Sequence, residues 1–228
     1  MANIGIIGGH GKVARLATPL LVERGNRVVS IIRKQEQAAE IEGLGAEPLV
    51  RDVMDLSREE MTELFREAGL DAVVWSAGVG GGDPERTWKV DRDAAIRSMD
   101  AAEAAGATRY VMVSYMGASL NHSVPEEDSF YAYAQSKAEA DEHLRGSNLE
   151  WTLLGPNSLS EEDPSGEIRV TAEPGESTAS RANVARVIDA VLADASTIRK
   201  AIPFTDGQTP IAEAIGSVPA ADRLDHAV

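Results

Sequence analysis

The stretch that most constrains the fold is residues 3–25, where a short apolar segment runs directly into a cluster of glycines. Asn3–Ile7 has the composition of a buried strand, and the glycine-rich turn at 8–11 follows it without a spacer. Apolar residues at helical spacing then continue to Gly25, where the pattern stops. Strand, tight turn and helix in this order predict an α/β fold with the turn at the carboxyl end of its first strand.

The spacing within the turn is G-x-x-G-x-x-A, formed by Gly8, Gly11 and Ala14. In a dinucleotide-binding turn the first position takes a positive φ, the second lets the main chain approach a pyrophosphate, and the third packs the helix closely on the strand. The helix N-terminus then offers free N–H groups and a partial positive charge to the phosphates. The alternative to a dinucleotide-binding turn is an ordinary tight connection between a strand and a helix. Lys12 is not a P-loop lysine, because Val13 follows it where Ser or Thr is required.

Composition excludes several classes of function. The 228 residues include no cysteine, and the four histidines show no metal-ligand spacing, so we expect no disulfide and no metal site. A net charge of −15 argues against nucleic acid and anionic membranes as partners. No signal peptide or membrane-length apolar run is recognisable, so we expect a cytoplasmic protein.

Strand and helix patterns alternate along the chain. Further strands are expected at residues 27–33, 47–50, 71–78, 109–114 and 149–154, with shorter ones at 167–172 and 200–204. Helices are expected at residues 35–42, 58–68, 87–105, 131–145, 181–193 and 209–215. Such βαβ units predict a doubly wound parallel sheet, the Rossmann fold, in three layers α/β/α. We expect one NAD(P)-binding domain over 1–218, with a small substrate region at about 156–218 and a tail at 219–228.

Ligands of a doubly wound sheet bind at the carboxyl ends of its strands, so the residues just past each strand are the candidate cofactor contacts. They are Gly8, Gly9, His10, Gly11, Lys12, Val13, Arg33, Lys34, Asp52, Val53, Ser76, Ala77, Gly78, Lys137 and Pro156.

The second strand ends in Arg33 and Lys34, with no acidic residue before Glu36. An acidic side chain here accepts from the ribose 2′-OH of NAD, whereas an arginine accommodates the 2′-phosphate of NADP. Arg33 can bind that phosphate bidentately and Lys34 can add a point charge, so the sequence favours NADP over NAD. The alternative is a solvated surface pair. Asp52, past the third strand, is placed either to accept from the adenine amino group or to serve as a turn residue.

The candidate catalytic residues are Ser114, Tyr133 and Lys137. Tyr133 and Lys137 are four residues apart, on one face of an expected helix. A phenol has an unperturbed pKa of about 10, and a neighbouring ammonium is expected to lower it toward a useful value for proton transfer. Lys137 can also hold ribose hydroxyls, and Ser114 can hydrogen-bond a substrate carbonyl. Taken separately, Tyr133 and Lys137 would be an exposed pair on a helix surface, and Ser114 would simply end a strand.

The chain resembles the atypical, single-domain short-chain dehydrogenases/reductases that bind NAD(P)H, which are similar to flavin and biliverdin reductases and to sugar-nucleotide epimerases. The likeness extends to about residue 215. Its motifs lie at residues 8–14, 33, 52–53, 76–78, 111–114, 133–137 and 180–185. Three features depart from the family: Ala14 replaces a glycine, His10 lies within the turn, and Gly155-Pro156 stands in place of Arg-Pro. His10 is expected to contact either a phosphate or solvent.

Two long polar segments, 115–130 and 156–180, are expected to flank the substrate pocket. Their acidic runs are interpreted as solvated, and Arg181 as an ion-pair partner for them rather than a substrate contact. The resemblance implies an NADPH-dependent reductase of a small carbonyl, quinone or flavin-like substrate, acting as monomer or homodimer. The alternatives are a non-catalytic NADP(H) sensor and a nucleotide-sugar epimerase, for which the C-terminal region is short.

Overall fold

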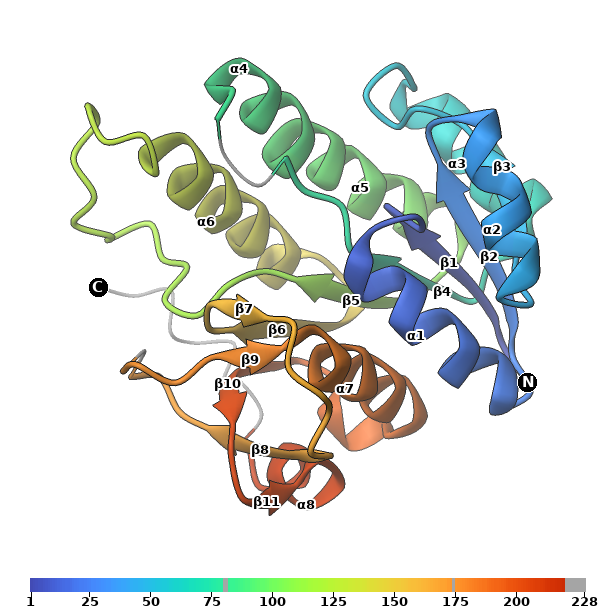
Figure 1. Cartoon of the computed structure of the whole chain (residues 1–228). Helices are drawn as coiled ribbons and strands as arrows, with labels where there is room; N and C mark the ends of the chain where they lie inside the picture. Colours follow the sequence, from blue (N-terminus) through green and yellow to red (C-terminus); the bar gives the residue numbers. More distant parts are fainter. Residues whose placement is uncertain (80–81, 174, 220–228) are drawn as a thin grey trace.

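The computed structural model describes residues 1–79, 82–173 and 175–219, and its centre is a nine-stranded sheet in the order β11-β8-β10-β6-β5-β4-β1-β2-β3 (Figure 1). Strand order reverses at the first strand, which pairs with β2 on one side and β4 on the other. This confirms the doubly wound Rossmann arrangement. The parallel strands are β3 (Glu47–Val50), β2 (Arg27–Ile32), β1 (Asn3–Ile7), β4 (Ala72–Trp75), β5 (Arg109–Val113), β6 (Glu150–Pro156) and β10 (Lys200–Asp206).

The C-terminal edge of the sheet departs from the parallel pattern. β8 (Glu167–Val170) runs antiparallel to β10, and β11 (Thr209–Pro210) runs antiparallel to β8. β7 (Leu159–Ser160) and β9 (Ala179–Ser180) form a separate parallel pair. The two-residue strands were not expected from the sequence, because a pair of residues has no detectable periodicity.

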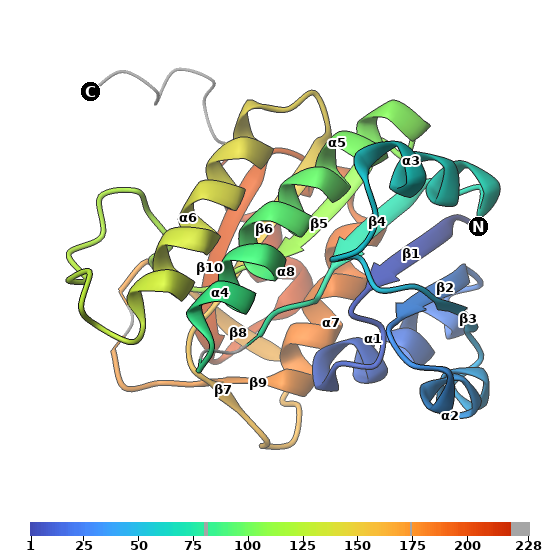
Figure 2. The ribbon, with the colours of Figure 1, turned by 90° about the horizontal axis from the view of Figure 1, so that it is seen from above.

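Helices cover both faces of the sheet (Figure 2). One face carries α1 (Lys12–Glu23), α2 (Ala38–Gly43), α7 (Arg181–Ala193) and α8 (Ile211–Gly216). The other carries α3 (Arg58–Glu67), α5 (Ala95–Ala105) and α6 (Tyr131–Gly146). Short turns η1 (Gln35–Gln37) and η3 (Ala195–Thr197) precede α2 and β10. In the described part of the chain, no helix is both long and apolar enough to cross a membrane.

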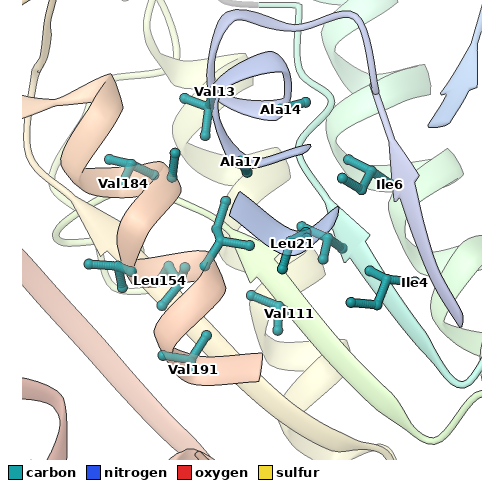
Figure 3. Packing of buried hydrophobic residues seen from close by; sticks show 14 of the residues in the cluster. Ile4, Ile6, Val13, Ala14, Ala17, Leu21, Val111, Leu154, Val184 and Val191 are labelled. Carbon is teal, nitrogen blue, oxygen red and sulfur yellow. The ribbon is translucent and has the colours of Figure 1, made fainter. Parts of the chain in front are cut away.

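The core on the α1 face explains the alanine in the glycine turn motif. Ala14 and Ala17 are almost fully buried, and α1 packs against α7 through Val184 and its neighbours (Figure 3). Small side chains let the helix approach the sheet, while each fully buried Val or Leu contributes about 1.5–3 kcal/mol. The packing role predicted for Ala14 is confirmed, and this packing fixes the start of α1 at the edge where the strands end.

The predicted helix over 87–105 is not regular. It consists of α4 (Pro84–Thr87), a π-helical segment η2 (Trp88–Ala94) and α5. Isolated π-helical turns are rare and frequently occur at functional sites. Here the segment carries Asp91, whose side chain is fully buried. The predicted end at Gly106 is confirmed, because this glycine caps α5 at a φ of 86°.

Candidate functional site

The turn after β1 has the geometry that a phosphate-binding loop needs. Gly8 has a φ of +80°, and a Cβ at this position would lie 2.7 Å from the backbone N and Cα of Ala77. The Gly11 N–H donates to the Gly8 carbonyl at 2.8 Å, which closes the turn. Gly11 is also the N-cap of α1 and offers its first turn no side-chain acceptor. The α1 N-terminus is therefore available to an anion.

Substituting Gly8 by alanine is expected to destabilise the fold by about 2 kcal/mol or more, since a left-handed conformation alone costs an L-residue about 1–2 kcal/mol and the Cβ also clashes with the backbone of Ser76 and Ala77 just after β4. Urea unfolding measures the change. Gly146→Ala is the matched control, because no atom lies within 4 Å of a Cβ there. Equal stability of the two variants would contradict this account of the turn.

A cleft of about 330 Å³ opens at the carboxyl ends of β1 to β4. Nine of the predicted cofactor residues line it: Gly8, His10, Gly11, Arg33, Asp52, Val53, Ser76, Ala77 and Gly78. Gly9, Lys12, Val13, Lys34, Lys137 and Pro156 are absent from its lining, although Gly9, Lys12 and Val13 belong to the same turn and helix start. Polar lining residues that the sequence did not single out are Gln37, Arg51 and Arg86.

The cleft is rich in positive charge where residues after β2 and β3 and a residue of α4 line it. Arg33, Arg51 and Arg86 line it, and Asp52 is the acidic residue among the described lining positions. The Asp52 Oδ1 accepts from the Met54 N–H at 3.0 Å, so its carboxylate stabilises the turn after β3 while lining the cleft. Lys34 lies beside Glu36 at 3.4 Å. Arg51 directly follows β3 and could have been found by the same strand-end rule, whereas Arg86 reaches the lining only through the placement of α4.

His10 is anchored at the mouth of the cleft. Its Nε2 lies 2.7 Å from the Glu40 Oε2, and the Gln37 Nε2 lies 3.2 Å from its Nδ1. Arg15 contacts the other Glu40 oxygen, and the Arg15 guanidinium together with His10 lowers the pKa of the Glu40 carboxyl. The ring therefore lines the cleft and is held by Gln37 of η1 and Glu40 of α2. These contacts fix its position at the turn, but they do not show whether it contacts a phosphate.

The Lys137 ammonium is buried and doubly engaged. Its side chain is 2% exposed, its Nζ donates to the Val113 carbonyl at 3.0 Å, and it lies 3.6 Å from the Asp91 Oδ1. The Asp91 Oδ2 in turn accepts from the Val79 N–H at 3.0 Å. Asp91 thus connects the loop after β4 to the lysine of α6. The sequence could not single it out, since it is one of several carboxylates in a charged helical stretch.

The Ser114 hydroxyl donates to the Asp141 Oδ2 at 2.6 Å. Asp141 is buried, and burial raises the pKa of its carboxyl to about 6 even though Ser114 and Lys137 favour the charged form. The sequence did contain a signal for this residue. Asp141 follows Lys137 by four positions and Tyr133 by eight, so all three lie on one face of α6.

Tyr133 lies within an aromatic cluster at the start of α6. Its ring centroid is 5.4 Å from those of both Tyr115 and Phe130. Burial raises the pKa of the phenol, and the carboxylates of Asp91 and Asp141 raise it further. The expectation that Lys137 lowers this pKa is wrong for this structure, because burial raises it most and the two carboxylates act in the same direction, while the Lys137 ammonium is paired with Asp91.

The residues present fit a dinucleotide. The glycine turn leaves no room for a Cβ at Gly8, the α1 N-terminus has no side-chain cap, and the cleft beside it is open. These are the features that a pyrophosphate and its attached nucleoside require. Within the described residues, no group of three or more His, Asp or Glu is placed to hold a metal ion.

Comparison with known proteins gives consistent matches over most of the chain. A family model described as NAD(P)H-binding matches residues 8–195. The chain is 32% identical to UPF0659 protein C216.03 of Schizosaccharomyces pombe, and the match covers 92% of each chain. A solved structure from Bacillus halodurans, named as an NAD-dependent epimerase/dehydratase, has a TM-score of 0.85 at 30% identity and covers 94% of this chain and 99% of that one.

A second solved structure, the oxidoreductase ylbE from Lactococcus lactis, has a TM-score of 0.83 at 28% identity, over 94% of this chain and 95% of the other. These relatives cover 92% to 94% of the chain, and they confirm the resemblance inferred from the motifs. The chain belongs to the NAD(P)H-binding family of oxidoreductase-like and epimerase-like proteins.

Proposed function

We propose that this protein is an NADP(H)-dependent reductase of a small carbonyl, quinone or flavin-like substrate. The observation that carries the proposal is that the cleft and the candidate catalytic residues both follow the carboxyl ends of strands in the same parallel sheet. The cleft beside the glycine turn lies past β1 to β4, and Ser114, Tyr133 and Lys137 follow at the ends of β5 and on α6. The segments 115–130 and 156–180 begin at the carboxyl ends of β5 and β6, and in this proposal they bound the substrate.

In this proposal Tyr133 is the proton donor. A bound dihydronicotinamide supplies a hydride. The Tyr133 phenol is protonated at neutral pH, so it has a proton to give to a developing alkoxide, although the burial that raises its pKa makes it a weaker acid than a free phenol. Ser114 would orient the substrate oxygen, and Lys137, which donates to the Val113 carbonyl and lies beside Asp91, would bind the ribose hydroxyls of the cofactor.

The test is oxidation of NADPH across a panel of carbonyls, quinones and flavins, followed at 340 nm. Turnover of at least one compound supports the reductase. Tight NADPH binding without any turnover would instead favour the sensor hypothesis. One observation supports that second candidate: the Ser114 hydroxyl and the Lys137 ammonium are already engaged, by Asp141 and by Asp91 with the Val113 carbonyl. A sensor also requires a partner whose binding changes with NADP(H).

We propose NADP over NAD because Arg33, Arg51 and Arg86 line the cleft together. Arg33→Ala is expected to weaken NADPH binding by about 10- to 100-fold, the loss of a charge-assisted contact of roughly 1.5–3 kcal/mol, and to change NADH binding by less than about 3-fold. Isothermal titration calorimetry measures both dissociation constants. The matched control is Arg58→Ala, which removes an exposed positive charge paired with Glu59 on α3. Equal wild-type affinities for NADPH and NADH would contradict the preference.

A further inference from the structure

A single carboxylate bridges the two helices that begin beside the cofactor turn. The Glu161 Oε1 lies 2.6 Å from the Lys12 Nζ and 2.9 Å from the Arg181 Nη1. Lys12 is the first residue of α1 and Arg181 the first of α7, and these helices pack against each other along their length. The ion-pair role predicted for Arg181 is confirmed. Its partner also neutralises the lysine of the glycine turn.

The charges at this point do not balance. Two cations share one carboxylate oxygen, and the uncapped N-terminus of α1 adds further positive potential. Lys12 holds the pKa of the Glu161 carboxyl below its usual value, with Arg181 assisting, so Glu161 is ionised at neutral pH. With Lys12 and Arg181 positive and Glu161 negative, these three side chains together carry a net charge of +1 (2 − 1) at neutral pH.

Glu161 can leave without disturbing the fold around it. Its side chain is 64% exposed and that of Lys12 is 62% exposed, whereas that of Arg181 is 22% exposed and also donates to the Ser160 carbonyl at 3.1 Å. The β7–β9 pair holds Ser160, and the Gly166 N–H donates to the Asn183 Oδ1 at 3.0 Å. The segment is thus tethered on both sides of Glu161, while the glutamate itself is held by exposed ion pairs, which are individually weak.

We propose that Lys12 and Arg181 form a phosphate-binding site, and that Glu161 occupies this site as an internal competitor until a ligand phosphate displaces it. Under the proposed function, on which this inference rests, the ligand is the diphosphate of NADP(H), because Lys12 directly follows the residues of the turn that line the cleft. A diphosphate carries more charge than one carboxylate and also reaches the α1 N-terminus. The same chemistry would serve a phosphate carried by a substrate.

The test compares Glu161→Gln with Glu162→Gln in the full chain at constant ionic strength. Both changes remove one negative charge from the same segment, but Glu162 forms its hydrogen bonds with Ser160. Calorimetry gives dissociation constants for NADPH and for inorganic diphosphate. We expect Glu161→Gln to bind NADPH about fivefold more tightly than wild type, since two exposed ion pairs no longer compete, and Glu162→Gln to stay within about twofold. In an Arg181→Ala background, the gain from Glu161→Gln should shrink.

Each outcome decides the proposal. A gain for both anions supports displacement by the cofactor. A gain for inorganic diphosphate without a gain for NADPH retains the phosphate site and assigns it to another ligand. Equal affinities for wild type and Glu161→Gln, with NADPH still bound, would overturn the site and leave the reductase proposal intact. Failure of the wild type to bind NADPH would refute the proposed function, and the diphosphate titration would then decide the site alone.

Discussion

Turnover of any accepted substrate by Tyr133→Phe is expected to be about 10²- to 10⁴-fold below wild type, the range that positioned proton transfer contributes. The substitution removes the phenolic oxygen and keeps the ring, so the contacts with Tyr115 and Phe130 remain. The NADPH dissociation constant is expected to change less than about twofold, because Tyr133 does not line the cleft. Steady-state kinetics and calorimetry on the same preparations measure both.

The matched control is Tyr131→Phe, two residues earlier on α6. Its ring stacks edge-on against His122, away from the Tyr133 cluster, so it loses a hydroxyl from the same helix without touching the proposed proton donor. It should retain wild-type turnover. Wild-type turnover in Tyr133→Phe would show that the proton comes from another group, and Ser114 with its partner Asp141 would be the next candidate.

Asp141→Asn is expected to stabilise the protein above pH 6 and to have little effect near pH 4. The folded protein raises the pKa of this carboxyl to about 6 from 3.8, so between these values the folded state binds more protons than the unfolded state. Wild-type stability from this group therefore falls as the pH rises through that window. At 1.36 kcal/mol per pH unit, the penalty relieved by asparagine is at most about 3 kcal/mol.

Urea unfolding of wild type and Asp141→Asn at intervals from pH 4 to pH 8 measures the difference. Asparagine keeps an oxygen that accepts from the Ser114 hydroxyl, so the hydrogen bond is preserved. Asp55→Asn removes the same charge from an exposed position and should show no comparable trend. A stability difference that is constant with pH, or one that grows toward acid, would contradict the assignment of the raised pKa to Asp141.

Much of the fold was predictable because it is encoded locally. The strands Asn3–Ile7 and Glu47–Val50 and the helix Arg181–Ala193 have the predicted bounds, since apolar runs, glycine stops and the Ser180 cap mark them in the sequence. The two-residue strands β7 and β9 are stabilised by each other and carry no local pattern. Part of the tail predicted at 219–228, from residue 220 on, lies outside the described residues.

The individual motifs of the candidate site were predictable from the sequence, but the contacts between residues of different elements were not. The glycine turn, Arg33 and the Tyr133–Lys137 spacing could be read directly, because each is a short motif with its own mechanism. The partner of Lys137 could not, since Asp91 lies 46 positions earlier and reaches it only through the packing of η2 on α6. That contact pairs the ammonium that was predicted to lower the pKa of the phenol.

The π-helical segment Trp88–Ala94 has a consequence for how this position varies among relatives. Its wider winding accommodates additional chain within one helical rod, and α5 continues directly from it. Loss of a single residue there would restore ordinary winding, and side chains within the segment would change their facing by up to roughly 100° while the turns on either side kept theirs. A different side chain would then face Lys137. A one-residue gap in an alignment at this point therefore changes which amino acid opposes the lysine, even where aspartate is retained in the sequence.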